Sequence, residues 1–404
     1  MPGTGARAAL SRLGVRGLAV VGAYVAASAT VLLIVILLRR AISPASLRAV
    51  LAFLFIAAVS SGLEPGTVRA ALLGGDAPGA DRRARLIAAA VKALVAAPFL
   101  AAAWRFADPA QSGWIWVWTP LVAFAGFAAT DARAMLDYQG HHSFAIGLKQ
   151  GSLAGGIAIV AAMITGGVPL FWAVGAATAA RVALIVTVPR GTGPPESFVV
   201  AWGHARRLLA DRKWMELAGA SAVAAIGGSA DRVLGLRFLP AHTYASYYVL
   251  YEILSKFWLL PYLLGPILFA RGVGREGKDP FAAHAWRLTA ACGAVFIVGV
   301  AGILVVAPGP AARLIGSDFG WPTVAFAAAV AITSLTQLRI AQLQAAGGAR
   351  RVLILMAFSA TFSVALFYGS VQLLGVRGLL GAWLVKSTVE FAAVMAMKGT
   401  RRAA

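Results

Sequence analysis

The stretch Leu18–Leu38, LAVVGAYVAASATVLLIVILL, decides the fold class, because it contains no charged residue and is followed at once by Arg39 and Arg40. A helix rises about 1.5 Å per residue and the hydrocarbon core of a bilayer is about 30 Å thick, so roughly 20 apolar residues form one membrane span. The run is too long for the apolar region of a signal peptide, which is the rival interpretation. We therefore predict that it is the first membrane-spanning helix.

The composition of the whole chain also indicates a membrane protein. Of its 404 residues, 60% are hydrophobic and 13% are charged, against roughly 45–50% and about 25% in soluble domains. This excludes a water-soluble enzyme. The net charge of +21 must lie in loops or along a polar cavity, so nucleic-acid binding explains it poorly. The single cysteine, Cys292, excludes an intramolecular disulfide.

The sequence predicts an all-α membrane protein with twelve spans. They lie at 15–38, 46–63, 86–106, 114–132, 144–165, 168–189, 214–236, 243–270, 286–307, 321–345, 352–374 and 376–397. Lys and Arg are concentrated in the termini and the even-numbered connections, which predicts that both termini are cytoplasmic.

Similar short motifs recur roughly two hundred residues apart. Pro44 corresponds to Pro240, and Gln139 to Gln344, in the same order along the chain. Six spans return the chain to its starting side, so we predict two six-helix bundles related by pseudo-symmetry. The predicted parts are a cytoplasmic N-terminus at 1–14, an N-terminal bundle at 15–189, a cytoplasmic linker at 190–213, a C-terminal bundle at 214–397 and a cytoplasmic tail at 398–404.

The second part of the linker, from Ser197 to Lys213, mixes apolar and basic residues. Phe198, Trp202 and two leucines alternate with Arg206 and Arg207. This pattern is typical of a short helix that lies on an anionic membrane surface. A solvated linker that only fixes the topology explains it equally well.

No catalytic or metal-binding motif is present. The sequence lacks a phosphate-binding loop, H-E-x-x-H, G-x-S-x-G and paired cysteines. We therefore expect no enzyme activity, no cofactor and no metal site.

Ionisable residues inside the predicted spans mark the candidate site, because each costs about 2.5–3.5 kcal/mol on insertion and usually faces a bundle interior or a hydrated path. An arginine keeps its charge, so a cationic lumen would suit an anionic cargo. The predicted substrate-binding cations are Arg181, Arg232, Arg339, Lys256, Lys386 and Arg133. The carboxylates predicted to form ion pairs or couple transport are Asp131, Asp231, Glu252 and Glu390.

Two alternatives remain open for these charges. Glu252 with Lys256, and Lys386 with Glu390, are four residues apart on one helix face and are also explained as structural ion pairs. Arginines near span ends are explained by snorkelling to the interface, which suits Arg181 least because it lies well inside its span.

The segment from Ser229 through Asp231, Arg232 and Pro240 to Tyr248 resembles spans seven and eight of the Wzx-type polysaccharide flippases, members of the multidrug, oligosaccharidyl-lipid and polysaccharide exporter superfamily. Similar stretches follow in the family's order, at 307–319, 344–351 and 375–382. The resemblance covers roughly residues 214–397 well and the first half more loosely.

The resemblance implies a bacterial inner-membrane protein of two six-helix bundles that moves a polyprenyl-diphosphate-linked oligosaccharide to the outer leaflet by alternating access. It carries over Arg232, with Asp231 beside it, as part of a cationic cavity. The implied partners are the lipid-linked oligosaccharide and the bilayer, with the polysaccharide polymerase and chain-length machinery left open.

Two other functions remain as alternatives. A cation-coupled multidrug exporter of the MATE type needs membrane carboxylates free to bind protons or Na⁺. A membrane enzyme acting on lipid-linked sugars would be expected to have a long outer loop or an acidic metal-binding motif, and the sequence has neither.

Overall fold

The computed structural model describes residues 22, 24–62, 82–110, 113–138, 142–187, 197–210, 212–272, 280–317 and 319–397. Every regular element in these ranges is a helix, as expected for a chain that must satisfy its backbone hydrogen bonds inside a bilayer. The predicted N-terminus at 1–14 and the tail at 398–404 lie outside these ranges.

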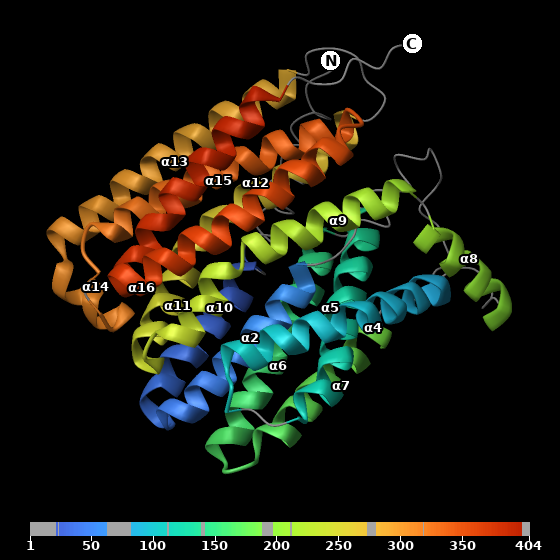
Figure 1. Cartoon of the computed structure of the whole chain (residues 1–404), viewed down its shortest axis with the longest axis horizontal. Coiled ribbons are helices and arrows are strands. Elements are labelled where there is room, and N and C mark those ends of the chain that lie inside the picture. Colours follow the sequence, from blue (N-terminus) through green and yellow to red (C-terminus); the bar gives the residue numbers. More distant parts are fainter. Residues whose placement is uncertain are drawn as a thin grey trace, which may run out of the picture. The chain divides into compact units, whose positions relative to one another are not determined.

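The described residues divide into two compact units. The first runs to Leu209, apart from Phe106–Asp108, and the second runs from Ala210 (Figure 1). The helices of the first unit are an N-terminal helix at Tyr24–Ala41, α2 (Pro44–Gly62), α4 (Arg82–Ala107), α5 (Ile115–Tyr138), α6 (His142–Thr165), α7 (Leu170–Thr187) and α8 (Phe198–Ala210).

The second unit is also entirely helical in its described part. Its elements are α9 (Arg212–Gly227), α10 (Ala230–Phe238), α11 (Ala241–Leu254), the short 3₁₀ helix η1 (Ser255–Trp258), α12 (Leu259–Gly272), α13 (Pro280–Val306), α14 (Pro308–Ile315), α15 (Pro322–Ala345) and α16 (Ala349–Ala396).

Each of the twelve predicted spans has a helical counterpart. Nine helices in the described part are long and apolar enough to cross a membrane, and Leu170–Val186 is a shorter apolar helix. One of the nine is α16, whose 48 residues contain a break at Gly375 between the predicted spans at 352–374 and 376–397. The chain is therefore a multi-pass membrane protein with an all-α fold.

The predicted span at 214–236 is not one straight helix. It is divided into α9 and α10 by a turn at Gly228 and Ser229. The sequence prediction of a single helix here was wrong in this detail. The division places Asp231 and Arg232 in the first turn of α10, where an acidic side chain is favoured by the free backbone N–H groups.

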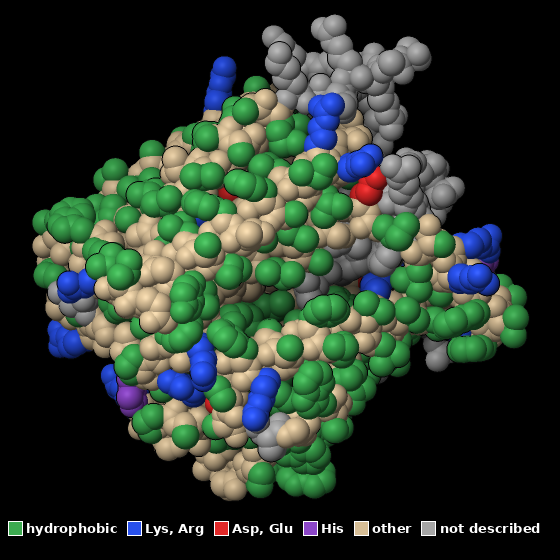
Figure 2. Space-filling model, in the orientation of Figure 1, with side chains coloured by type: hydrophobic (Ala, Val, Ile, Leu, Met, Phe, Trp, Pro, Cys, Tyr) green, Lys and Arg blue, Asp and Glu red, His purple; other side chains and the backbone are tan. Residues whose placement is uncertain are grey.

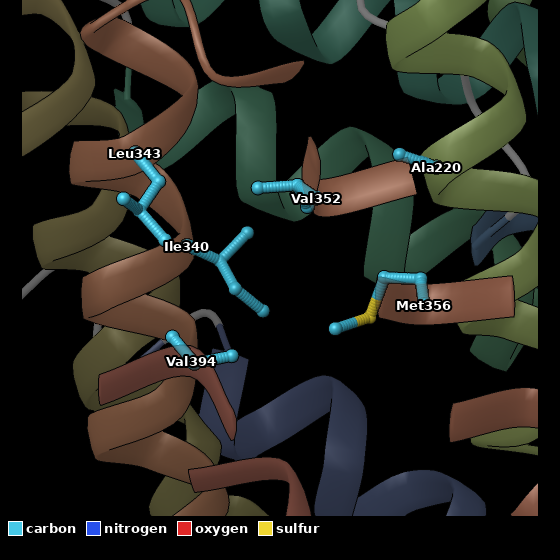
Figure 3. Packing of buried hydrophobic residues seen from close by; sticks show 6 residues of the cluster. All are labelled: Ala220, Ile340, Leu343, Val352, Met356 and Val394. Atoms are coloured by element: carbon cyan, nitrogen blue, oxygen red, sulfur yellow. The ribbon is translucent and has the colours of Figure 1, made fainter. Parts of the chain in front are cut away.

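Apolar side chains cover both the interior and the outer surface. In the second unit, α9, α15 and α16 enclose a core of Ala220, Ile340, Leu343, Val352, Met356 and Val394 (Figure 3). On α13, Val295 and Val298 are 73% and 70% exposed, and Figure 2 shows hydrophobic side chains over much of the visible face. Such an exterior fits contact with lipid chains.

The break in α16 depends on glycine. Gly375 has φ 59° and ψ −137°, a backbone conformation that side chains with a Cβ strongly disfavour. Three residues later, Gly378 lies against the backbone of Ser370, where a Cβ would not fit. The chain therefore doubles back within a few residues, which joins two spans without a longer loop.

We expect Gly375→Ala to destabilise the protein by about 1–3 kcal/mol, because no atom outside the local chain is near enough to clash and only the backbone conformation is penalised. Thermal unfolding of the purified protein in detergent measures the effect. Gly381→Ala, in the helical part of α16 with open space around it, is the matched control and should be neutral or slightly stabilising. Equal melting temperatures for the two variants would contradict the account of the break.

Candidate functional site

Arg181 is the most deeply buried of the six predicted cations, at 3% exposure. It lies on α7, and its Nη2 donates a hydrogen bond to Oγ of Ser61 on α2 at 3.1 Å. Its side chain packs beside Gly156 on α6, where even an added Cβ would lie at ordinary contact distance. Within the described residues, no carboxylate lies within salt-bridge distance of Arg181 and its Nε has no hydrogen-bond partner.

Ser61 is the point at which four helices of the first unit meet. Its carbonyl oxygen accepts hydrogen bonds from Oγ1 of Thr130 on α5 and from Nζ of Lys149 on α6, both at 3.0 Å. Its hydroxyl donates to the carbonyl of Ala57 at 2.9 Å. We call Ser61, Thr130, Lys149 and Arg181 the Ser61 cluster. It brings two cationic side chains to one neutral serine.

The close approach of α5 to α2 depends on a small residue. A Cβ on Gly126 would overlap Ser60 on α2, including its backbone carbon. Gly126 lies one turn before Thr130, and its carbonyl shares the single proton of the Thr130 hydroxyl with the carbonyl of Ser61, each oxygen lying 3.0 Å from Oγ1. This contact holds Thr130 within reach of Ser61.

The predicted carboxylate Asp131 forms an ion pair in the first unit. Its Oδ2 lies 2.9 Å from Nε of Arg85 on α4. Asp131 is 6% exposed, and Arg133, two residues further along α5, is half-buried. Of the two roles predicted for Asp131, the structure shows the ion pair.

In the second unit, Asp231 is fully buried among aromatic residues. One carboxylate oxygen, Oδ2, accepts hydrogen bonds from the hydroxyl of Tyr247 on α11 and from Nε1 of Trp383 on α16, the latter at 3.1 Å. Nε of Arg232 lies 4.0 Å from Oδ1. The carboxylate therefore connects three helices of this unit.

Arg232 lies between polar and aromatic partners. Its Nη2 donates to Oγ of Ser229 at 2.9 Å and to the carbonyl of Gly228 at 3.3 Å. Its guanidinium also stacks over the ring of Tyr251, 5.0 Å from the centroid, which stabilises a cation away from water.

The two predicted pairs with a spacing of four residues are both present. Nζ of Lys256 lies 2.5 Å from Oε2 of Glu252, and Nζ of Lys386 lies 2.7 Å from Oε1 of Glu390. Glu390 also accepts a hydrogen bond from Ser359. These four residues thus form ion pairs within their own helical segments.

Arg339 differs from the paired cations of the second unit. Its Nη2 donates to the carbonyl of Met397 at 3.1 Å, and its Nη1 lies 3.5 Å from Oε1 of Gln342. Among the described residues no carboxylate lies within 4.0 Å of it. Arg339 is only half-buried, so it is more accessible to water than Arg181.

The predicted cations therefore differ in their partners. Arg232, Lys256 and Lys386 each lie beside a carboxylate, whereas among the described residues Arg181 is held by the hydroxyl group of Ser61. A buried guanidinium that no described carboxylate neutralises can bind a phosphate oxygen through its remaining N–H groups.

Sequence reasoning missed several polar partners. Lys149 lies inside the predicted span at 144–165 but is not among the predicted substrate-binding cations. Ser61, Thr130, Tyr247 and Trp383 carry no charge, so only their contacts identify them. Within the described part of the chain, no group of three His, Cys, Asp or Glu residues could hold a metal ion.

Comparison with known proteins identifies solved structures with the same fold. No protein-family model and no curated protein matches the sequence. Solved structures do match: the lipid II flippase MurJ in an inward closed conformation has a TM-score of 0.62 at 10% identity, with 92% of this chain and 86% of that chain covered. A multidrug resistance MATE family transporter of the MOP superfamily, in an outward-facing conformation, has a TM-score of 0.58 at 15% identity, with 94% and 93% covered.

A third match is the eukaryotic MATE transporter AtDTX14, with a TM-score of 0.56 at 12% identity and 96% of both chains covered. The likeness extends over nearly the whole length of each protein. The predicted fold class is confirmed: the chain has the all-helical fold of twelve spans in two bundles found in the MATE and MurJ structures.

The hydrogen bonds to Asp231 predict a difference between two substitutions. Asp231→Ala removes the acceptor of the Tyr247 hydroxyl, whereas Nε1 of Trp383 keeps the Tyr247 hydroxyl oxygen as a partner at 3.2 Å; a buried group left unsatisfied costs about 1–3 kcal/mol. Asp231→Asn keeps an acceptor oxygen and should lose less. Thermal unfolding of both variants in detergent tests this, and equal melting temperatures would show that the hydrogen bonds contribute little.

Proposed function

We propose that this protein is a flippase that moves a polyprenyl-diphosphate-linked oligosaccharide from the cytoplasmic to the outer leaflet of the bacterial inner membrane by alternating access. The single observation that carries the proposal is Arg181, a buried cation with no carboxylate partner among the described residues. The fold shared with the lipid II flippase MurJ supports it.

The chemistry of the cargo explains why such a cation would be retained. An isolated ion in hydrocarbon faces a solvation cost of tens of kcal/mol. A diphosphate headgroup therefore needs a polar path, and guanidinium groups can form paired hydrogen bonds with phosphate oxygens. In this proposal the Ser61 cluster binds the diphosphate, the sugars occupy a hydrated lumen and the polyprenyl tail stays in lipid.

The predicted topology gives the Ser61 cluster a role in the transport cycle. Thr130 lies near the end of the predicted span at 114–132 and Lys149 near the start of the span at 144–165, which are the ends assigned to the cytoplasmic side. A lipid-linked oligosaccharide made in the cytoplasm would reach this side first. We therefore assign the cluster to the initial binding of the headgroup.

The second candidate is a cation-coupled multidrug exporter, which the fold shared with the MATE transporters supports equally. Such an exporter needs a carboxylate that exchanges a proton or Na⁺. The four predicted carboxylates all have partners: Asp131 pairs with Arg85, Asp231 accepts from Tyr247 and Trp383, Glu252 pairs with Lys256 and Glu390 pairs with Lys386. This favours the anionic cargo.

We assign no enzyme activity to the chain, and the polymerase and chain-length machinery are proposed partners.

Transport by reconstituted protein tests the proposal. Arg181→Gln keeps N–H donors for Ser61 but removes the charge, so we expect the translocation rate of a fluorescent polyprenyl-diphosphate oligosaccharide to fall at least about tenfold, the loss expected for a hydrogen bond to a charged group. Arg181→Lys should retain more activity. The measurement is the accessibility of the labelled sugar to an impermeant quencher in proteoliposomes.

The matched control is Arg350→Gln, which removes one exposed charge at the start of α16 and should leave the rate unchanged. Wild-type rates in the Arg181→Gln variant would contradict the proposed function. Gradient-driven uptake of cationic dyes, abolished by Asp131→Asn and unaffected by Arg181→Gln, would instead establish the exporter.

A further inference from the structure

Helix α8 is an amphipathic helix that the proposed transport mechanism does not use. It begins after Ser197, whose hydroxyl oxygen accepts a hydrogen bond from the backbone N–H of Val200 at 3.4 Å, as at a helix N-cap. One face is buried: Ala201 and Ala205 are almost fully covered. The helix is therefore held against the first unit and is more than a solvated linker.

The buried face of α8 packs on the beginning of α4. Ala205 forms a cluster with Ala84 and Ala88, and Leu209 packs against the same cluster. Figure 1 shows α8 beside one end of α4. Because the stretch of α4 that is long and apolar enough to cross a membrane begins at Arg83, the contact places α8 beside one end of that stretch.

The outward face of α8 combines large apolar side chains with arginines. Phe198, Val199 and Trp202 are 66%, 79% and 48% exposed, and Arg206 and Arg207 are also exposed. In Figure 2, basic and hydrophobic side chains lie together over this helix. The apolar residues belong to its first half and the arginines to its second half, with Arg207 in the last turn.

We propose that α8 docks on the surface of a membrane containing anionic phospholipids. Phe198, Val199 and Trp202 enter the boundary between headgroups and acyl chains, and Arg206 and Arg207 bind lipid phosphates. The depth of the helix, its exposed aromatic residues and its positive charge all match an interfacial helix. This docking does not depend on the identity of the cargo.

A protein partner fits the surface less well than lipid. The exposed apolar side chains lie beside a membrane-spanning helix, at the level where Trp side chains and basic residues normally meet the headgroups. In this arrangement the apolar residues lie level with the ends of the acyl chains, and the basic residues lie level with the headgroups. The alternative, in which a second copy of the chain covers α8, is one of the outcomes that the experiment distinguishes.

The experiment uses the full-length protein with one spin label on α8. Val199→Cys is made in a Cys292→Ser background, and the purified protein is reconstituted in vesicles of phosphatidylcholine, with or without phosphatidylglycerol. Collisions with oxygen, which concentrates in lipid, and with a water-soluble nickel chelate report the position of the label. Val298→Cys on α13, 70% exposed within an apolar span, gives the reference for the bilayer interior.

We expect the label at position 199 to be shielded from the nickel chelate, and more so when phosphatidylglycerol is present. Replacing Arg206 and Arg207 with Gln should reduce the ratio of docked to undocked helix about fivefold for each arginine in the anionic vesicles. Replacing the exposed Arg350 and Arg351 with Gln removes the same charge elsewhere and should have no such effect.

Three results would overturn the proposal. The first is a label that is open to the nickel chelate in both kinds of vesicle. The second is a label shielded from both reagents in detergent as well as in vesicles, which would place a second copy or another part of the protein over α8. The third is shielding of the label that depends on phosphatidylglycerol but is changed equally, or not at all, by the Arg206 and Arg207 double variant and the Arg350 and Arg351 double variant.

Discussion

The cost of holding a charge away from water is the constraint on which this structure depends. A chain with a net charge of +21 crosses the membrane many times, and each ionisable group in a span must find a partner or a polar path. In the second unit, Lys256 and Lys386 meet this requirement with carboxylates on their own helical segments. In the first unit, Arg181 is stabilised by hydrogen bonding to Ser61 and keeps its net positive charge. This difference gives the Ser61 cluster its proposed capacity to bind an anion.

The helices that bring these groups together are positioned by small residues. Gly126 allows α5 to approach α2, because a Cβ there would overlap Ser60. In the second unit, aromatic side chains fill the interior around Asp231. Tyr247 and Trp383 orient its carboxylate by donating hydrogen bonds to it. One unit thus has a cluster in which Arg181 and Lys149 both donate hydrogen bonds to Ser61, whereas the other has a tightly packed polar network around Asp231.

Much of the fold could be predicted from the sequence, because the bilayer fixes the length and composition of each span. The separation of two spans at Gly375 and the ion pairs of Lys256 and Lys386 followed from local spacing alone. The division between α9 and α10 was not predicted, although the run Gly227, Gly228 and Ser229 favours a turn. The Ser61 cluster also could not be predicted, because Ser61, Thr130 and Lys149 are brought together by packing of helices distant in sequence.

Ligand-dependent stability of the purified protein tests the central claim most directly. A ligand that binds the folded state raises its melting temperature with increasing concentration. The account predicts saturable stabilisation by a short-chain prenyl diphosphate, much weaker stabilisation by the corresponding prenyl alcohol, and loss of the difference in Arg181→Gln. Equal stabilisation by the diphosphate and the alcohol, or an unchanged difference in Arg181→Gln, would contradict the claim that the buried guanidinium binds an anionic headgroup.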